Sequence, residues 1–453
     1  MLLNSTFIFQ LTFVNQAIII NLPTRIKTNN LSMDSRVEIN VCSEVGELEG
    51  VILHTPGAEL ENMTPKNAQR ALYSDILNLA VARKEYAQLS GVLSKIAKTY
   101  QVSDLLTQVV SNEKAKEHLI DQICNLENNY GIKDELLMLD PKELSRQLIE
   151  GVTLKRNNLT SFLSKERFSS SPLFNFYFTR DASISIHNEV LISKMASQVR
   201  QRETLIMESI FNLSGTFKTV TVNPLKFTEN DNVTIEGGDI LIAREDILLV
   251  GSSLRTSTQG IDFIINRMLT KSEIKKQYIL VQELPEAPES FIHLDMVFTF
   301  LDVDKCMIFE PVILQPNKYQ TVQITIENGK VQNIKNVENL IVALKDLGMD
   351  LKPIYCGGRK DQWTQEREQW HSGANFFAIG PGKVIGYARN IYTMEEMSLN
   401  GFEIIRAKDV INNRIDLKDF KKFVITIDGS ELPRGGGGAR CMTMPVKRKN
   451  IAW

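Results

Sequence analysis

The chain has 453 residues, of which 43% are hydrophobic, so it can bury one large core or two smaller ones and has the composition of a globular protein. Lys and Arg total 52 against 54 for Asp and Glu, and a formal charge of -2 gives no basic field that would attract nucleic acid or an anionic membrane. We therefore expect a small-molecule partner, with no nucleic acid and no membrane.

Residues 1–32 differ from the rest of the chain. An apolar stretch from Phe7 to Leu22 is interrupted by polar residues and preceded by no Lys or Arg, so it fits neither a signal peptide nor a membrane span. Met33 stands directly before the segment where globular patterning begins. We expect an N-terminal extension over 1–32, disordered or arising from a misassigned start, and a folded domain over 33–453.

A helical pattern runs from Lys66 to Phe168. Apolar residues from Leu72 to Ile96 are spaced by threes, fours and sevens, which predicts a long amphipathic helix. Shorter helical patterns follow at Leu119–Leu126, Leu136–Leu139 and Leu144–Ile149. Together these patterns predict a helical bundle over residues 66–168, inserted into the rest of the fold.

Four β-hairpins with one layout follow Ser171, and a polar side chain stands before the first strand of each. The four polar residues are Asp181, Asp239, Asp295 and Asn375. A fifth apolar run, Gly50 to His54, has no local partner and could pair with Cys441–Val446 near the C-terminus. That pairing would close a ring, in which neighbouring repeats complete one core.

In such a ring, polar residues at equivalent strand starts would converge near the axis. Asp and Asn also commonly cap turns before strands, which explains any single one of them without a site. Their recurrence at all four hairpins favours one shared pocket.

His293 and Asp295 alternate with apolar residues in the segment FIHLDMVF, which predicts a strand with both polar side chains on one face. Histidine has an unperturbed pKa of about 6.5, which suits proton transfer near neutral pH. The pair is therefore a candidate acid/base beside an anion. The alternative is a histidine that only hydrogen-bonds a backbone carbonyl.

Glu236 lies in the segment TIEGGD, where Gly237 and Gly238 allow a bulge or a close approach of the backbone to a ligand. The chain has no HExxH motif, no CxxC pair, no EF-hand loop and no phosphate-binding glycine motif. We therefore expect no metal and no cofactor.

A run of four glycines leads to Cys441 in the segment RGGGGARC. Glycines let the backbone approach a ligand closely, and a cysteine thiolate is a strong nucleophile. The five cysteines of the chain fit neither a disulfide framework nor a zinc site, so we expect a reducing, cytoplasmic compartment. The alternative is a loose tail whose cysteine is incidental.

The acids around this cysteine and histidine favour a cationic substrate, because carboxylates accept paired hydrogen bonds from a guanidinium group. A bound guanidinium would also favour ionisation of the thiol beside it. Sulfur would attack the central carbon, the histidine would protonate departing ammonia, and water would complete the reaction.

From Arg36 to Arg448 the chain resembles the arginine deiminases, in the segments CSEVGELEGVILHTPGAELENMTP, FYFTRD, RQRET, EGGD, RTSTQG, HLDMVF and SELPRGGGGARCMTMP. The resemblance implies an α/β fold: a five-bladed α/β propeller (pentein) of ββαβ-type modules around a pseudo-fivefold axis, with an inserted α-helical bundle. It also implies a homo-oligomeric enzyme that needs neither metal nor organic cofactor.

By this resemblance, Cys441 is the nucleophile and His293 the general acid/base, and Glu236 supports the histidine. Asp181 and Asp295 are the pair that grips the guanidinium. A second set binds substrate: Arg200 and Arg255 for the α-carboxylate, Phe178 and Asn175 in the pocket lining, and Asp239 as a further polar contact. Without the resemblance, Arg200 in the charge-rich segment RQRE would be interpreted as part of a solvated helix face.

Two positions depart from the family pattern. Gly436 stands where a second loop arginine is common, two residues after Arg434, and Ala182 stands where proline usually follows the Asp of FTRD. The lost cation bears on gating, affinity or substrate choice, and Ala182 on backbone stiffness.

The leading hypothesis is hydrolysis of free L-arginine to L-citrulline and ammonia through a covalent cysteine thiouronium-type intermediate. Arg200 and Arg255 favour an α-amino acid over agmatine, which lacks a carboxylate. Two alternatives stay open: a related guanidino or ureido hydrolase, such as a dihydrolase giving ornithine, and a noncatalytic arginine-binding module.

Overall fold

The computed structural model describes residues 36–68, 73, 75–228, 230–270 and 275–453. The predicted extension over 1–32 lies outside the described residues. None of the helices in the described part of the chain is both long enough and apolar enough to cross a membrane.

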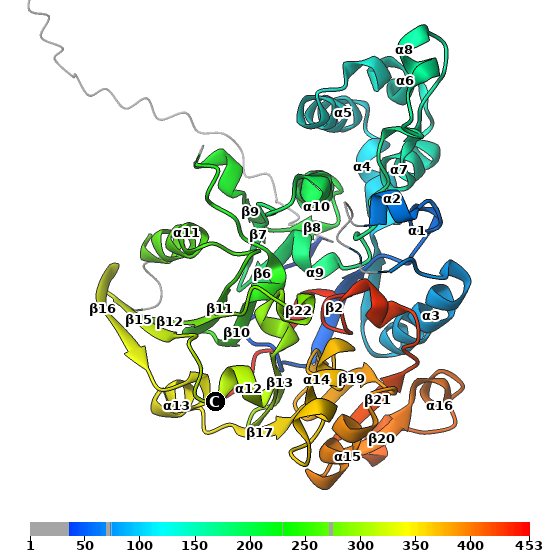
Figure 1. The fold of residues 1–453 in the computed structure, drawn as a ribbon. Coiled ribbons are helices and arrows are strands. Elements are labelled where there is room, and N and C mark those ends of the chain that lie inside the picture. Colours follow the sequence, from blue (N-terminus) through cyan, green and yellow to red (C-terminus); the bar gives the residue numbers. More distant parts are fainter. Residues whose placement is uncertain (1–35, 69–72, 74, 229, 271–274) are drawn as a thin grey trace, which may run out of the picture. The chain divides into compact units, whose positions relative to one another are not determined.

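Five sheets repeat one plan (Figure 1): two antiparallel strands are followed by a helix and then by a strand that pairs in parallel with the second. A parallel partner requires such a crossover, because a tight turn only returns the chain in the opposite direction. In each sheet the order is antiparallel pair, then parallel strand: β22 (Met444–Arg448), β2 (Leu48–Leu53), β3 (Lys98–Gln101); β6 (Ser183–Ile186), β7 (Glu189–Ile192), β9 (Val220–Val222); β10 (Ile240–Arg244), β11 (Ile247–Ser252), β12 (Lys276–Glu283); β13 (Phe298–Asp302), β14 (Lys305–Ile308), β17 (Lys352–Tyr355); β18 (Phe377–Gly380), β19 (Lys383–Tyr387), β21 (Phe423–Ile427).

The crossover helices of the five units are α3 (Leu79–Ile96), α10 (Gln201–Leu213), α11 (Thr258–Leu269), α13 (Leu340–Asp346) and α15 (Ile391–Leu399). The last strand of the chain, β22, is antiparallel to β2, with Ile52 opposite Met444. The predicted hairpin repeat and the predicted pairing of its two ends are therefore confirmed.

Several strands were not predicted from the sequence. The hairpin β15 (Thr321–Glu327) and β16 (Lys330–Val337) extends the third sheet, and β20 (Glu403–Arg406) extends the fifth. The hairpin turns at Asn328–Gly329, where both residues have positive φ, a conformation that Asn-Gly pairs adopt readily. Two short pairs complete the strands: β1 (Val37–Glu38) with β8 (Phe217–Lys218), and β4 (Val152–Thr153) with β5 (Phe168–Ser170).

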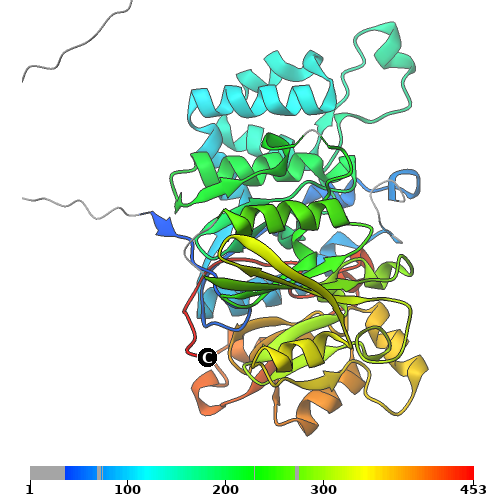
Figure 2. The same ribbon diagram turned by 90° about the vertical axis from the view of Figure 1, so that its left-hand side faces the viewer.

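The region after β3 is helical and packs beside α10 (Figures 1 and 2). Its helices are α4 (Val102–Val110), α5 (Glu113–Glu127), α6 (Lys133–Met138), α7 (Pro141–Glu150) and α8 (Leu159–Leu163). The buried apolar faces of α4, α5, α6 and α7 share a cluster with Ile206 and Ile210 of α10. The remaining short helices are α1 (Ala58–Glu61), α2 (Pro65–Ala68), α9 (Thr179–Ala182), α12 (Glu310–Ile313), α14 (Gln362–Trp370) and α16 (Ala407–Ile411).

The long amphipathic helix begins later than its apolar stripe suggests. The side chain of Asn78 accepts a hydrogen bond from the Val81 amide at 3.2 Å and caps α3. Ile76 therefore precedes the helix, and Leu72 lies outside the described residues. The predicted stripe from Leu79 to Ile96 matches α3.

Candidate active site

Short helical turns, not strands, hold three of the four polar residues that precede the hairpins. Asp181 lies in α9, Asp239 in the 3₁₀ turn η4 (Gly237–Asp239) and Asp295 in the 3₁₀ turn η6 (Leu294–Met296). The strand predicted for His293 and Asp295 is therefore wrong. The chain turns there because the Asp239 carboxylate accepts from the Leu294 amide at 2.9 Å and the Met296 amide donates to the His293 carbonyl at 3.1 Å.

His293 lies between two carboxylates. Its Nε2 is 3.0 Å from Glu236 Oε2, and its Nδ1 is 3.8 Å from Asp181 Oδ1. A Cβ at position 238 would lie 2.5 Å from His293 Nδ1, so only glycine lets the backbone of the EGGD segment pass the imidazole ring. The close approach inferred from the two glycines is thus to the histidine.

The buried acids hold His293 in its cationic form. Burial alone would lower the pKa of His293, but the charge of Asp181 and the hydrogen bond with Glu236 outweigh it and raise the pKa to about 9. Burial alone would raise the pKa of Glu236, but its bond with His293 prevails and lowers that pKa to about 2. At neutral pH the two groups therefore form an imidazolium–carboxylate pair.

Cys441 is buried, with 3% of its surface exposed, so it does not belong to a loose tail. Its Sγ lies 3.8 Å from Asp295 Oδ2 and 3.9 Å from Asp295 Oδ1. Burial, together with the charges of Asp295 and Asp181, raises the pKa of the Cys441 thiol well above its ordinary value. In the absence of a cation beside it, this thiol is protonated at neutral pH.

Asn375 forms hydrogen bonds with the backbones of both Cys441 and Asp295. Its Oδ1 accepts from the amides of Arg440 at 2.9 Å and Cys441 at 3.2 Å, and its Nδ2 donates to the Asp295 carbonyl at 3.0 Å. The hairpin repeat singled out Asn375 in the sequence as a strand start and as a candidate for the shared pocket, without assigning it a role. Its contacts identify it as the residue that orients the cysteine backbone.

Arg440 and Glu44 form a second network that the sequence analysis missed. Arg440 Nη1 donates to Asp295 Oδ2 at 2.8 Å, while its Nε and Nη2 donate to Glu44 at 3.0 and 2.9 Å. All three side chains are buried. Both residues stood in motifs already noted, Arg440 in RGGGGARC and Glu44 in CSEVGE, but nothing local indicated that they meet.

Arg200 is buried, and its interpretation as part of a solvated helix face is wrong. Its Nη1 donates to Asp181 Oδ2 at 2.7 Å, and its Nε and Nη2 donate to Glu203 at 3.1 and 2.8 Å. Arg255 is half-buried, with Nη1 3.9 Å from Glu236 Oε1. Both arginines thus lie beside the acids of the site, and Arg200 is bound to one of them.

The other three candidate residues lie around this centre. Asp239 accepts from Ser253 Oγ at 2.6 Å as well as from Leu294, and burial raises its pKa to about 6. The ring of Phe178 packs on the glycine run, since a Cβ at Gly437 would lie 2.4 Å from it. Asn175 is buried, and its carbonyl accepts from Arg200 Nη2 at 3.4 Å.

Three of these groups could hold a divalent ion. Donor atoms of Asp181, Glu236 and His293 all lie within 4.8 Å of one another, which suits a site of mixed carboxylate and imidazole ligands. The sequence, by contrast, contains no metal-binding motif. Asp181 Oδ1 is buried and accepts no hydrogen bond from any described residue, so it can also receive an organic cation.

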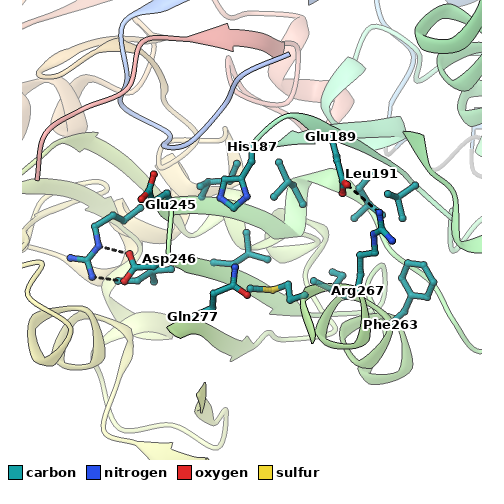
Figure 3. A pocket seen from close by; sticks show the side chains of 16 residues that line it. His187, Glu189, Leu191, Glu245, Asp246, Phe263, Arg267 and Gln277 are labelled. Carbon is teal, nitrogen blue, oxygen red and sulfur yellow. Dashed lines mark hydrogen bonds and ion pairs between the residues drawn. The ribbon is translucent and has the colours of Figure 1, made fainter. Parts of the chain in front are cut away.

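A mainly apolar pocket lies at the turn ends of the hairpins β6–β7 and β10–β11 (Figure 3). It is a space of about 50 Å³ lined mainly by apolar side chains, including Ile247 and Phe263. Ion pairs stand at its rim, Arg244 with Asp246 and Arg267 with Glu189. Cys441, His293 and the acids around them do not line it.

Comparison with known proteins gives consistent matches over most of the chain. The family profile described as arginine deiminase matches residues 69–448. The arginine deiminase of Bacillus cereus (strain ATCC 10987 / NRS 248) is 33% identical over 432 residues, covering 91% of this chain and 99% of the relative. That of Treponema denticola is 35% identical with the same coverage.

Solved structures match more distantly. The N-terminal domain of ArgZ, an arginine dihydrolase solved with its substrate, is 12% identical with a TM-score of 0.49, covering 88% of this chain and 98% of that one. A dimethylarginine dimethylaminohydrolase from Pseudomonas aeruginosa, solved with citrulline, is 13% identical with a TM-score of 0.47 and covers 88% and 99%.

Proposed function

The chain belongs to the arginine deiminase family, and we propose that it hydrolyses free L-arginine to L-citrulline and ammonia. One observation carries the proposed site: the Cys441 thiol lies 3.8 Å from the Asp295 carboxylate, among buried acids of which Asp181 offers an oxygen with no hydrogen-bond donor in the described residues. A planar guanidinium supplies the donors and the positive charge that this arrangement lacks.

Substrate binding prepares the nucleophile. Asp181 and Asp295 accept hydrogen bonds from the substrate guanidinium, whose charge then lies beside the Cys441 sulfur. A neighbouring cation stabilises the thiolate and lowers the raised pKa of the thiol. Cys441 thus becomes a nucleophile only when the substrate is in place.

The thiolate attacks the central guanidinium carbon and forms a C–S bond. Cationic His293 gives its proton to one terminal nitrogen, which leaves with its bonding electrons as ammonia, and an amidino thioether remains on Cys441. Neutral His293 then takes a proton from water as the oxygen attacks the same carbon. The C–S bond breaks and the thiolate is restored. The new hydroxyl releases its remaining proton to the solvent, and the carbon keeps the oxygen as the carbonyl of citrulline.

The α-carboxylate of the substrate is bound by Arg255, together with Arg200. Arg255 is half-buried, and its guanidinium lies next to Glu236, at the acid that supports His293. Arg200 lies next to Asp181, to which its Nη1 donates a hydrogen bond. A planar arginine fork suits a carboxylate, which favours an α-amino acid over agmatine.

We infer further that residues 33–453 are the catalytic domain and residues 66–168 its helical insertion. The five free cysteines support a reducing, cytoplasmic compartment. Family membership alone supports a homo-oligomer.

The proposal is tested with purified protein in separate incubations with L-arginine, agmatine and L-citrulline, by measuring ammonia and the carbon product. We expect one ammonia and one citrulline per arginine, no reaction with agmatine or citrulline, and no turnover by Cys441→Ala. Ornithine as the product would identify a dihydrolase. Binding of arginine without turnover by the wild type would identify a binding module.

A further inference from the structure

One side of α3 holds the segment that leads into the glycine run, residues 428–434, which we call the loop arm. Gln88 Nε2 donates to Asp428 Oδ2 at 2.8 Å, and the Asp428 amide donates back to Gln88 Oε1 at 3.0 Å. One turn earlier in α3, Glu85 accepts from the amide of Ser430 at 2.6 Å and that of Leu432 at 2.9 Å. The arm therefore runs antiparallel to the helix.

Glu85 is the central contact of this arrangement. Its carboxylate also accepts from the Glu431 amide at 3.1 Å and from the Ser430 hydroxyl. Glu85 is 2% exposed, and its charge-assisted bond with the Leu432 amide is buried, while its bonds with Ser430 and Glu431 are part-buried. Removing the charged acceptor would weaken the bonds to three consecutive backbone amides, of which the Leu432 amide is buried.

The far end of the arm is held at the surface. The Asn78 amide donates to Glu431 Oε2 at 2.8 Å, and Arg434 pairs with Asp75 and with Glu431. Arg434 and Asp75 are 37% and 52% exposed, so their pair contributes little compared with the buried Glu85 contacts.

The glycine run connects this arm to the nucleophile and has no stiffness of its own. Its glycines fit closely against the site: a Cβ at Gly437 would lie 2.4 Å from the Phe178 ring, and one at Gly438 would lie 2.6 Å from Asn375 Oδ1. The Cys441 end is fixed by Asn375. Within the run, the Gly437 carbonyl accepts from the Tyr387 hydroxyl at 3.0 Å. The end next to the loop arm is held by the contacts of the arm with α3.

We propose that Glu85 is a positioning residue for Cys441: its carboxylate fixes the loop arm, and through it the place of the thiol beside Asp295. The effect on turnover rests on the proposed function. The effect on the thiol itself does not, since the chemical reactivity of Cys441 is measurable without any substrate.

The test uses Glu85→Gln in the full chain, with Glu368→Gln as the matched control. Glu368 is 5% exposed and accepts from the amides of Tyr392 and Thr393 at 2.9 and 2.8 Å and from the Thr393 hydroxyl at 2.6 Å, away from the loop arm. Three quantities are measured for each variant: kcat and KM for L-arginine, the thermal midpoint, and the rate at which iodoacetamide alkylates Cys441, followed by peptide mass spectrometry.

We expect Glu85→Gln to lower kcat roughly tenfold or more, since a buried charged acceptor is lost, and to speed Cys441 alkylation by a similar factor. Glu368→Gln shifts the thermal midpoint comparably but leaves kcat and the alkylation rate within about twofold of the wild type. If both variants show the same kcat and the same alkylation rate, Glu85 is only a structural residue and the proposal is wrong.

Ser430→Ala tests the same anchor if Glu85→Gln does not fold, because it removes only the hydroxyl donor. We expect a roughly threefold fall in kcat and a parallel rise in alkylation, as one hydrogen bond predicts. Unchanged values would count against the anchor. A wild type that does not consume arginine overturns the proposed function, while the alkylation rates still decide the role of Glu85.

Discussion

The starting ends and the turn ends of the hairpins bury different kinds of side chain. At the starting ends, Asp181 and Asp295 are buried among charged partners, with Cys441 and His293 beside them. At the turn ends, the pocket of Figure 3 is mainly apolar, and its charged pairs stand at the rim. At the hairpins β6–β7 and β10–β11, the acids of the site therefore lie at one end and the apolar pocket at the other.

The two ends also differ in the free energy of burying their side chains. Buried charges are unfavourable unless they are paired, and the loss of one partner costs about 3–5 kcal/mol. The starting ends meet most of this requirement with ion pairs, in which Arg440 bridges Glu44 and Asp295, and leave Asp181 Oδ1 open for a substrate cation. The turn ends need no such pairing inside, since apolar burial stabilises them directly.

The largest effect separating the two ends is expected for Cys441→Ser. A serine hydroxyl is a far weaker nucleophile than a thiolate, so turnover of L-arginine falls by roughly 10⁴-fold or more. Steady-state citrulline production measures this, with the thermal midpoint as the check on folding. A variant that keeps a tenth of wild-type turnover would remove Cys441 from the chemistry.

Asp181→Asn is expected to lower kcat/KM about 100-fold, because a charged hydrogen bond to the guanidinium is replaced by a neutral one. Asp246→Asn at the pocket rim is the matched control, since Asp246 also pairs with an arginine but lies at the turn end. Its kcat/KM should stay within about twofold of the wild type. Equal losses in both variants would erase the distinction between the ends.

Glu236→Gln is expected to shift the pH dependence. Glu236 helps raise the pKa of His293 to about 9, so kcat/KM of the wild type falls as the pH rises through about 9 and the imidazolium is lost. Removing the negative charge lowers the pKa of His293, and the fall begins at a lower pH. Profiles of kcat/KM from pH 6 to 10 show this, and an unmoved alkaline limb would mean that another group titrates there.

The same pair sets a stability window. The raised pKa of His293 stabilises the fold fully below about 6.5 and progressively less up to about 9, while the lowered pKa of Glu236 stabilises it above about 4.5 and less towards about 2. The contribution of this pair to the free energy of unfolding is therefore greatest between these two windows, near pH 4.5 to 6.5.

The smallest effect on activity is expected at the turn ends. Ile247→Ala, in a buried residue that lines the pocket, should lower the free energy of unfolding by about 2–5 kcal/mol through the cavity it leaves. Its kcat/KM at a temperature where it is folded should match the wild type. Urea denaturation and steady-state kinetics give the two numbers, and a large kinetic defect without loss of stability would contradict the separation.

Local patterning predicted the repeat because each hairpin carries its own signal. The four polar strand starts and the distant partner of Gly50–His54 were readable from apolar runs and turns alone. The hairpin β15–β16 was missed although Asn328–Gly329 is a strong turn signal, because its strands are rich in polar residues.

Contacts between residues far apart in the chain could not be predicted from local patterning. Glu85 and Ser430 are separated by 345 positions, and Glu44 and Arg440 by 396, so no spacing rule links them. The alternating apolar residues around His293 and Asp295 predicted a strand, but the same alternation also fits a 3₁₀ turn. Only the hydrogen bond from the Leu294 amide to the Asp239 carboxylate decides between the two.

The central claim is that the Cys441 sulfur bonds covalently to the substrate carbon and that His293 is needed to release it. The most direct measurement treats His293→Ala with an arginine analogue whose leaving group is a thiol, which departs without a proton from the histidine, and then maps the cysteines by peptide mass spectrometry. We expect a stable amidino adduct on Cys441 in one-to-one ratio with the protein. An unmodified Cys441, or an adduct on another cysteine, would contradict it.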